Sequence, residues 1–202
     1  MSRLVIGLLR PYRGWLAIVF AGSLSAQTAD FDLTIAITKV NTNGPGTNEP
    51  AITYDKSGKQ PFYVLLTNKS GVTKHLWQEW YSWGYWNLYF EFTDRTGRTW
   101  TVRRSYDRAS SIDGPGWFEL EPGETHVFKV TFPDDWQDLP KVDNPPPTHA
   151  TYVTIRAIYE TQPDGMIQRG GVQMMGTTTK DNGVWTGKAI SNAVEVHLFD
   201  PK

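Results

Sequence analysis

The chain has 202 residues, with 20 basic and 21 acidic side chains, a formal net charge of −1 at pH 7 and no cysteine. A charge this close to zero argues against nucleic acid as the main partner. The lack of cysteine excludes disulfide scaffolds, thiol catalysis and thiolate metal sites.

The first 26 residues have the pattern of a secretory signal peptide. Arg3, Arg10 and Arg13 form a basic leader without acidic residues, an apolar run follows at 14–22, and small residues end at Ala26. The apolar run is shorter than the ~20 residues that a membrane-spanning helix needs. We therefore predict cleavage close to Ala26, export to the periplasm or the extracellular space, and no stable membrane span after cleavage.

Residues 27–202 are predicted to form a single domain. Removal of the leader takes away three arginines and no acid, so the formal charge moves from −1 to −4. About 175 residues suffice to bury a core without disulfides.

Alternating apolar residues predict the first strands. Residues 31–40 place Phe31, Leu33, Ile35 and Ile37 on one face. Further along, 51–54 reads as a short edge strand, 62–67 as a central strand that is apolar on both faces, and 76–81 as a short helix or irregular cover.

The segment 83–104 is the clearest hairpin. One face of its first strand carries Gly84, Trp86, Leu88, Phe90 and Phe92, and the other carries Trp83, Tyr85, Asn87, Tyr89 and Glu91. The turn D-R-T-G at 94–97 suits a three-residue hairpin loop. Pairing Asp94 with Arg98 predicts four further pairs: Phe92 with Trp100, Glu91 with Thr101, Phe90 with Val102 and Tyr89 with Arg103.

The rest of the chain also reads as strands joined by loops. Strands are predicted at 117–121, 126–132, 151–160 and 191–199, a proline-rich irregular segment at 134–149, and a long glycine-rich loop at 162–183. Many short strands with almost no helical pattern predict an all-β fold, an immunoglobulin-like Greek-key β-sandwich of about seven to nine strands. A jelly roll is the second choice.

Five segments resemble secreted bacterial immunoglobulin-like domains of unassigned function. They are P-F-Y-V-L-L-T-N-K-S, S-W-G-Y-W-N-L-Y-F-E-F-T-D-R-T-G, L-E-P-G-E-T, T-I-R-A-I-Y-E and V-W-T-G-K-A-I-S-N. The order of a strand ending in Asn, a D-x-x-G hairpin and L-x-P-G-E more loosely resembles the bacterial intracellular proteinase inhibitors. Together these likenesses cover most of residues 60–199. They imply a fold, and neither supplies a catalytic motif.

The chemistry-bearing residues do not form a known catalytic pattern. His75, His126, His149 and His197 lie outside any H-E-x-x-H motif, and no serine lies in G-x-S-x-G. His197 is expected on a solvent face beside Glu195. The pairs Glu119 and Glu121, and Asp134 and Asp135, are typical of solvated surface rather than of a glycosidase cleft. We therefore expect no enzyme activity and no bound metal or cofactor.

The outward aromatic residues of the hairpin are the candidate ligand site. Trp83 and Tyr85 are spaced so that their rings could form a continuous surface, with Tyr89 beyond Asn87 and Arg103 opposite Tyr89. The alternative is that a neighbouring segment such as 76–81 folds over this face and buries it. Burial is slightly favoured, because large exposed apolar patches are uncommon on soluble monomers.

These patterns favour an exported, non-catalytic binding module with a protein or polysaccharide ligand. One alternative is a carbohydrate-binding module that uses the aromatic face of the hairpin. Another is a proteinase inhibitor that presents the proline-stiffened segment 134–149.

Overall fold

A computed structural model describes most of the chain after the leader, and its strands outnumber those predicted. The described residues are 30–37, 50–53, 61–79, 82–105, 116–133, 135–140, 150–162, 167–169, 172–174 and 183–199. They contain fourteen strands and one short helix, α1 (Ser82–Tyr85). The strands are β1 (Phe31–Ala36), β2 (Ala51–Thr53), β3 (Phe62–Asn68), β4 (Lys74–Trp77), β5 (Leu88–Asp94), β6 (Thr99–Arg104), β7 (Trp117–Leu120), β8 (Thr125–Val130), β9 (Trp136–Gln137), β10 (Ala150–Thr161), β11 (Ile167–Arg169), β12 (Val172–Met174), β13 (Gly187–Ile190) and β14 (Val194–Phe199).

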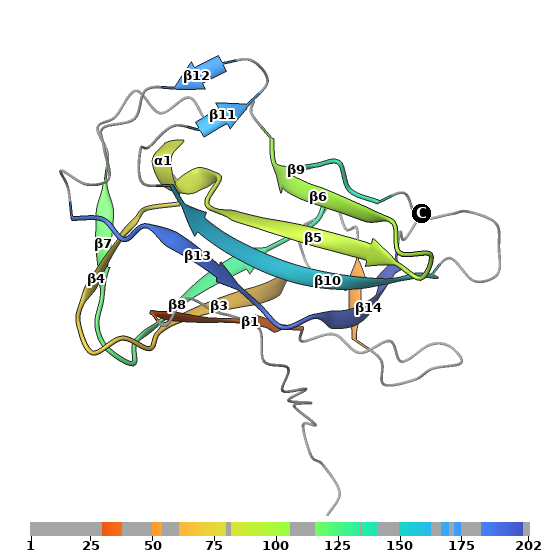
Figure 1. Cartoon of the computed structure of the whole chain (residues 1–202). Helices are drawn as coiled ribbons and strands as arrows, with labels where there is room; N and C mark the ends of the chain where they lie inside the picture. The colour runs from red at the N-terminus through yellow and green to blue at the C-terminus, as the bar shows by residue number, and fades with distance from the viewer. Residues whose placement is uncertain are drawn as a thin grey trace, which may run out of the picture.

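Two sheets face each other and form an all-β sandwich (Figure 1). The smaller sheet has the order β1-β3-β8, and every pair in it is antiparallel. The larger sheet has the order β2-β14-β10-β5-β6-β9, with β13 pairing the far end of β10. Within the described part of this sheet, β2 runs parallel to its neighbour β14, at the edge. The long strand β10 is therefore the centre of the larger sheet.

Alternation along the strands builds the core between the sheets. Phe31 and Leu33 of β1 are 1% exposed, and Val64 and Leu66 of β3 are fully buried. Phe90 of β5 faces them from the other sheet and lies 5.5 Å, ring centre to ring centre, from Phe62. Burying aromatic and aliphatic side chains removes a large apolar area from water, so a core of this kind stabilises the fold without disulfides.

The predicted hairpin register is confirmed. Phe90 pairs Val102, Glu91 pairs Thr101 and Phe92 pairs Trp100 between β5 and β6. Asp94 N donates to Arg98 O (3.0 Å), and Gly97 takes the positive φ of 85° that the turn requires. The edge strand predicted at 51–54 is also present, as β2.

The chain just before this hairpin differs from the prediction. Residues Lys74–Trp77 form strand β4, not a helix, because they pair with β7 from a distant part of the chain. Trp83 and Tyr85 belong to α1, not to a strand, so the period-two alternation begins only at Leu88. Strand β13 was not predicted at all.

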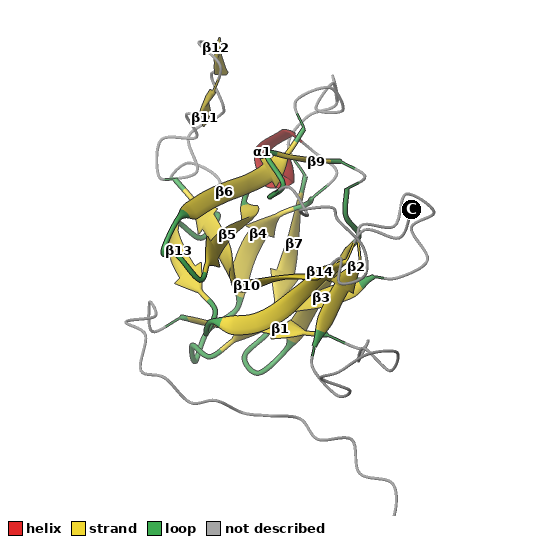
Figure 2. Ribbon diagram, turned by 90° about the vertical axis from the view of Figure 1, so that its right-hand side faces the viewer, coloured by secondary structure: helices red, strands yellow, loops and turns green. Residues whose placement is uncertain are grey.

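Four strands lie outside the two main sheets (Figure 2). β4 and β7 form a two-stranded ribbon, which stands at one end of the sandwich at the left of Figure 1. β11 and β12 form a second small hairpin within the predicted loop 162–183. No helix in the part of the chain described here is long and apolar enough to span a membrane.

The core strands are divided between the two sheets as in an immunoglobulin-like sandwich. Taken along the chain, β1, β3 and β8 share one sheet while β5, β6, β10 and β14 share the other. An immunoglobulin-like domain divides its strands A, B and E from C, F and G in this way. The specific Greek-key connection stays a prediction that this order supports.

Candidate functional site

Of the four residues predicted to bind a ligand, Tyr89 and Arg103 come together. The Arg103 guanidinium lies 3.9 Å from the centre of the Tyr89 ring, a cation–π contact that follows from their places on β5 and β6. Tyr89 Oη donates to Glu160 Oε2 (2.6 Å), and Lys188 Nζ lies 3.7 Å from the same oxygen. Burial, and then the hydrogen bond to Glu160, raise the pKa of Tyr89. Only 4% of Tyr89 is exposed, so neighbouring side chains cover the ring and leave little of it for a ligand to contact.

Tyr85 lies elsewhere. It is 8% exposed and packs edge-on against Trp86, with ring centres 5.6 Å apart. The Arg104 guanidinium lies over its ring, 5.0 Å from the ring centre. The side chain of Trp83 lies outside the described part. The sequence spacing predicts a continuous surface from Trp83 and Tyr85, with Tyr89 beyond Asn87, and slightly favours burial of this face instead. Tyr85 and Tyr89 sit on different elements and both are buried, so the burial alternative holds for these two residues.

An exposed aromatic residue lies instead on the ribbon. Trp117 of β7 is 43% exposed, although it pairs with Trp77 of β4, which is 2% exposed. The two rings meet edge to face, with centres 6.4 Å apart. Two residues further along each strand, on the same face of the ribbon, His75 pairs with Glu119, and His75 Nε2 lies 3.5 Å from Glu119 Oε1. We call these four side chains, His75, Trp77, Trp117 and Glu119, the ribbon face.

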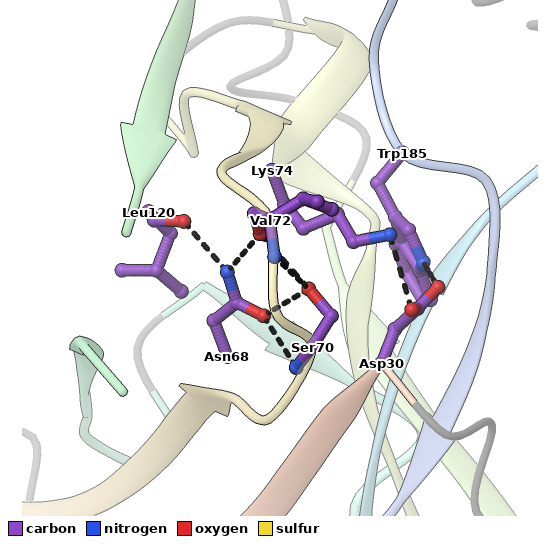
Figure 3. A network of polar contacts seen from close by, with 7 residues as sticks. All are labelled: Asp30, Asn68, Ser70, Val72, Lys74, Leu120 and Trp185. Carbon is purple, nitrogen blue, oxygen red and sulfur yellow. Dashed lines mark hydrogen bonds and ion pairs between the residues drawn. The ribbon is translucent and has the colours of Figure 1, made fainter. Parts of the chain in front are cut away.

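A buried asparagine fixes the ribbon to the smaller sheet (Figure 3). Asn68, at the end of β3, is fully buried, and its Nδ2 donates to Leu120 O (2.8 Å) and Val72 O (2.9 Å). Its Oδ1 accepts from Ser70 N (2.9 Å) and Ser70 Oγ (2.7 Å). Both donor hydrogens and the carbonyl oxygen are thus used, as a buried amide requires.

Asp30 ties the same corner to the other sheet (Figure 3). Its Oδ1 lies 3.0 Å from Lys74 Nζ at the start of β4, and its Oδ2 accepts from Trp185 Nε1 (3.0 Å) just before β13. The contact with Lys74 is the main reason that the pKa of Asp30 lies below its ordinary value. Two sheets and the ribbon therefore meet at one carboxylate.

The second edge of β4 is covered by the segment before β13. His75 bridges Val184, and Trp185 N donates to His75 O (2.8 Å). Gly183 approaches the His75 ring, since a Cβ on it would lie 3.8 Å from His75 Nδ1. The backbone of β4 is held on both sides, so the ribbon face is a rigid surface.

Two of the other histidines, His126 and His197, are packed within the fold. The His126 ring lies between Phe118 and Phe128, with ring centres at 4.4 Å and 4.5 Å, and burial lowers its pKa. His197 is 4% exposed and contacts Tyr152, so its predicted place on a solvent face is wrong. Its backbone N donates to Pro50 O (2.9 Å), next to edge strand β2. His149 lies outside the described residues.

The described side chains include no group of three or more His, Asp or Glu residues able to hold a metal ion together. The ribbon face offers different chemistry: an indole ring, a carboxylate acceptor and an imidazole that can donate or accept. These groups suit the binding of a ligand that presents an apolar surface beside hydroxyl groups.

The sequence held a signal for the ribbon face that our interpretation did not use. In the predicted strand 117–121, Trp117 alternates with Glu119 and Glu121, while Phe118 and Leu120 take the opposite face. A tryptophan that shares a strand face with two acidic residues fits an exposed position better than a core position, because acidic residues are mostly exposed. The partner strand could not be found in this way, because β4 pairs β7 across about forty residues of intervening chain.

Searches with the whole sequence found neither a family model nor a curated protein that matches this chain.

Proposed function

We propose that this chain is an exported, non-catalytic binding module whose ligand site is the ribbon face. The observation that carries the proposal is the exposure of Trp117, which is 43% exposed in a protein whose other described tryptophans are at least partly buried. Trp is enriched among the residues that dominate binding energies, because one ring contributes a large contact area. A rigid support for such a ring lowers the entropy that is lost on binding.

The N-terminal pattern supports the exported location. A basic leader, a short apolar run and small residues up to Ala26 precede Asp30, the first described residue. Lys69 N donates to Asp30 O (2.8 Å), so the folded domain takes up the chain four residues after the proposed cleavage site.

The inhibitor alternative receives less support. In the described part of the proline-rich segment, Trp136 and Pro140 are buried, whereas an inhibitory loop has to be exposed. Trp136 packs 5.0 Å from Phe90, ring centre to ring centre, so this side chain belongs to the core, whereas Gln137 and Asp138 beside it are exposed. Asp134 and residues 141–149 lie outside the described part.

The experiment is a binding screen with a matched pair of surface variants. The full chain and its Trp117→Ala and Val127→Ala variants are tested against immobilised polysaccharides and extracellular proteins. Val127 is 50% exposed on β8 and is the control for loss of exposed apolar surface. We expect Trp117→Ala alone to lose the ligand, and we expect the ligand to be recovered with its mass unchanged. Binding that survives in Trp117→Ala would refute the site, and turnover of the ligand would refute the non-catalytic assignment.

A further inference from the structure

The apolar surface around Trp117 is small. The large apolar side chains that are well exposed in the described part are Val72, Trp117 and Val127, and only Trp117 lies on the ribbon face. Its same-face neighbour on β7 is Glu119, and the pair across the ribbon is His75 with Glu119. A stable protein interface buries about 800 Å² on each partner around an apolar centre. One ring bordered by charged and polar groups fits a small repeating unit better than a protein surface.

We infer that the ribbon face binds a neutral polysaccharide, an inference that rests on the function proposed above and names its ligand class. A pyranose ring presents C–H groups on its faces, and these pack on the electron-rich face of an indole. Its hydroxyl groups point outward around the ring and need acceptors and donors at the side. Glu119 and His75 supply both kinds of group next to Trp117.

The spacing of these groups matches a sugar chain. Trp117 and Glu119 are successive same-face residues of β7, so they lie ~7 Å apart along the strand. A sugar stacked on Trp117 can therefore place a hydroxyl of the same or the next unit at the Glu119 carboxylate. His75 Nε2 lies 3.5 Å from that carboxylate, and the His75 side chain is itself 36% exposed.

Charge decides between neutral and acidic polysaccharides. Glu119 is 63% exposed, and Glu121, which directly follows β7, is exposed as well. Residues 27–202 carry a formal charge of −4. A sulfated or uronic acid chain would meet like charge at the site and around it, whereas a neutral chain would not.

The ring is held ready for stacking. The edge-to-face contact with Trp77 fixes the orientation of the Trp117 indole, and Trp77 is itself buried. Asn68 and Asp30 hold the ribbon against both sheets. Little conformational freedom is left to lose when a ligand binds.

The test measures retention of the full chain on cellulose, chitin, a neutral β-glucan, a neutral mannan and a sulfated polysaccharide. Four variants are compared with the unaltered chain: Trp117→Ala, Trp117→Phe, Glu119→Gln and Val127→Ala. We expect retention on at least one neutral polysaccharide. We expect about a tenfold or greater loss of affinity for Trp117→Ala, a loss typical of a central tryptophan contact. Trp117→Phe keeps a ring and should retain part of the affinity, and Val127→Ala should bind like the unaltered chain.

Glu119→Gln keeps the shape of the side chain and removes its charge. We expect about a threefold to tenfold loss, because a hydroxyl bonds a carboxylate more strongly than an amide oxygen. This variant and Trp117→Phe decide the question if circular dichroism shows that Trp117→Ala does not fold.

Several results would overturn the inference. No retention on any neutral polysaccharide, retention only on the sulfated one, or full retention of Trp117→Ala and Trp117→Phe alike would each do so. If Trp117→Ala instead loses an extracellular protein while no polysaccharide binds, the ligand class is wrong and the proposed function stands. If nothing that binds the chain depends on Trp117, both are wrong.

Discussion

Gly84 shows how one residue permits the turn from the ribbon into the central hairpin. Gly84 lies in α1, close to the residues that end and follow β4. A Cβ on Gly84 would lie far inside contact distance of Gln78 O and 2.8 Å from Trp77 O. Backbone atoms cannot move aside as the end of a flexible side chain can. The sequence pattern placed Gly84 on the inner face of a strand. A glycine has no side chain, so the sequence does not show which neighbouring atoms come close to it.

We expect Gly84→Ala to destabilise the protein by roughly 1–3 kcal/mol, the usual range for overpacking. Gly71→Ala is the control, because a Cβ there has no atom within 4 Å. Denaturant unfolding followed by tryptophan fluorescence measures both. Equal midpoints for the two variants would show that α1 does not need the close approach.

His126 gives the protein a dependence on pH. Its ring is packed between Phe118 and Phe128, and burial lowers its pKa, while Glu79 and Glu124 partly oppose that shift. The unfolded chain therefore takes up a proton on His126 before the folded chain does. Stability from this residue is present above 6.5, the ordinary pKa of histidine, and is lost as the pH falls below it.

We expect the urea midpoint to fall between about pH 7.5 and about pH 5.5, and to fall less in His126→Phe, which keeps the aromatic contacts and cannot be protonated. Urea unfolding at several pH values measures this. The same fall in both proteins would assign the acid sensitivity to another group.

At the scale of elements, local pairing was predictable and distant pairing was not. The β5–β6 hairpin followed from alternation and from the D-R-T-G turn, because both strands lie within about twenty residues. The β4–β7 ribbon depends on the corner at Asn68, where a polar side chain receives its partners from segments far apart in the sequence. Helical spacing at 76–81 misled the prediction for this reason: tertiary pairing outweighs a single turn of apparent periodicity.

We expect Asn68→Ala to destabilise the chain by roughly 1–3 kcal/mol, because the buried Leu120 O and the part-buried Val72 O lose their donor. The effect should be largest at the ribbon. Hydrogen exchange of β4 and β7 amides, compared with those of β5 and β10, measures it. Ser70→Ala, which removes one hydroxyl at a partly exposed position, is the milder control. Uniform loss of protection across all four strands would mean that the corner is not specific to the ribbon.

At the scale of the whole molecule, the sandwich was predictable from composition and alternation. Apolar alternation repeats in β1, β3, β8 and β14, so each of these strands has one apolar face that has to be buried against another layer. The ligand site was placed on the hairpin because outward aromatic residues look exposed in a single strand. Tyr89 is buried by Arg103, Glu160 and Lys188, which arrive from three other strands.

The export prediction belongs to this scale. We expect the protein recovered from its native cell to begin near Gln27 and to be found outside the cytoplasm, because residues 1–26 have the pattern of a cleaved signal. N-terminal sequencing with cell fractionation measures it. A native chain that still begins at Met1 would contradict it.

The most direct measurement compares Trp117→Ala with Arg103→Ala on the neutral polysaccharide panel. Arg103 belongs to the site predicted on the hairpin, and Trp117 belongs to the ribbon face. We expect the unaltered chain and Arg103→Ala to be retained equally on the neutral polysaccharide. We expect Trp117→Ala not to be retained. Retention of Trp117→Ala together with loss of Arg103→Ala would place the site on the outer face of the hairpin and contradict this account.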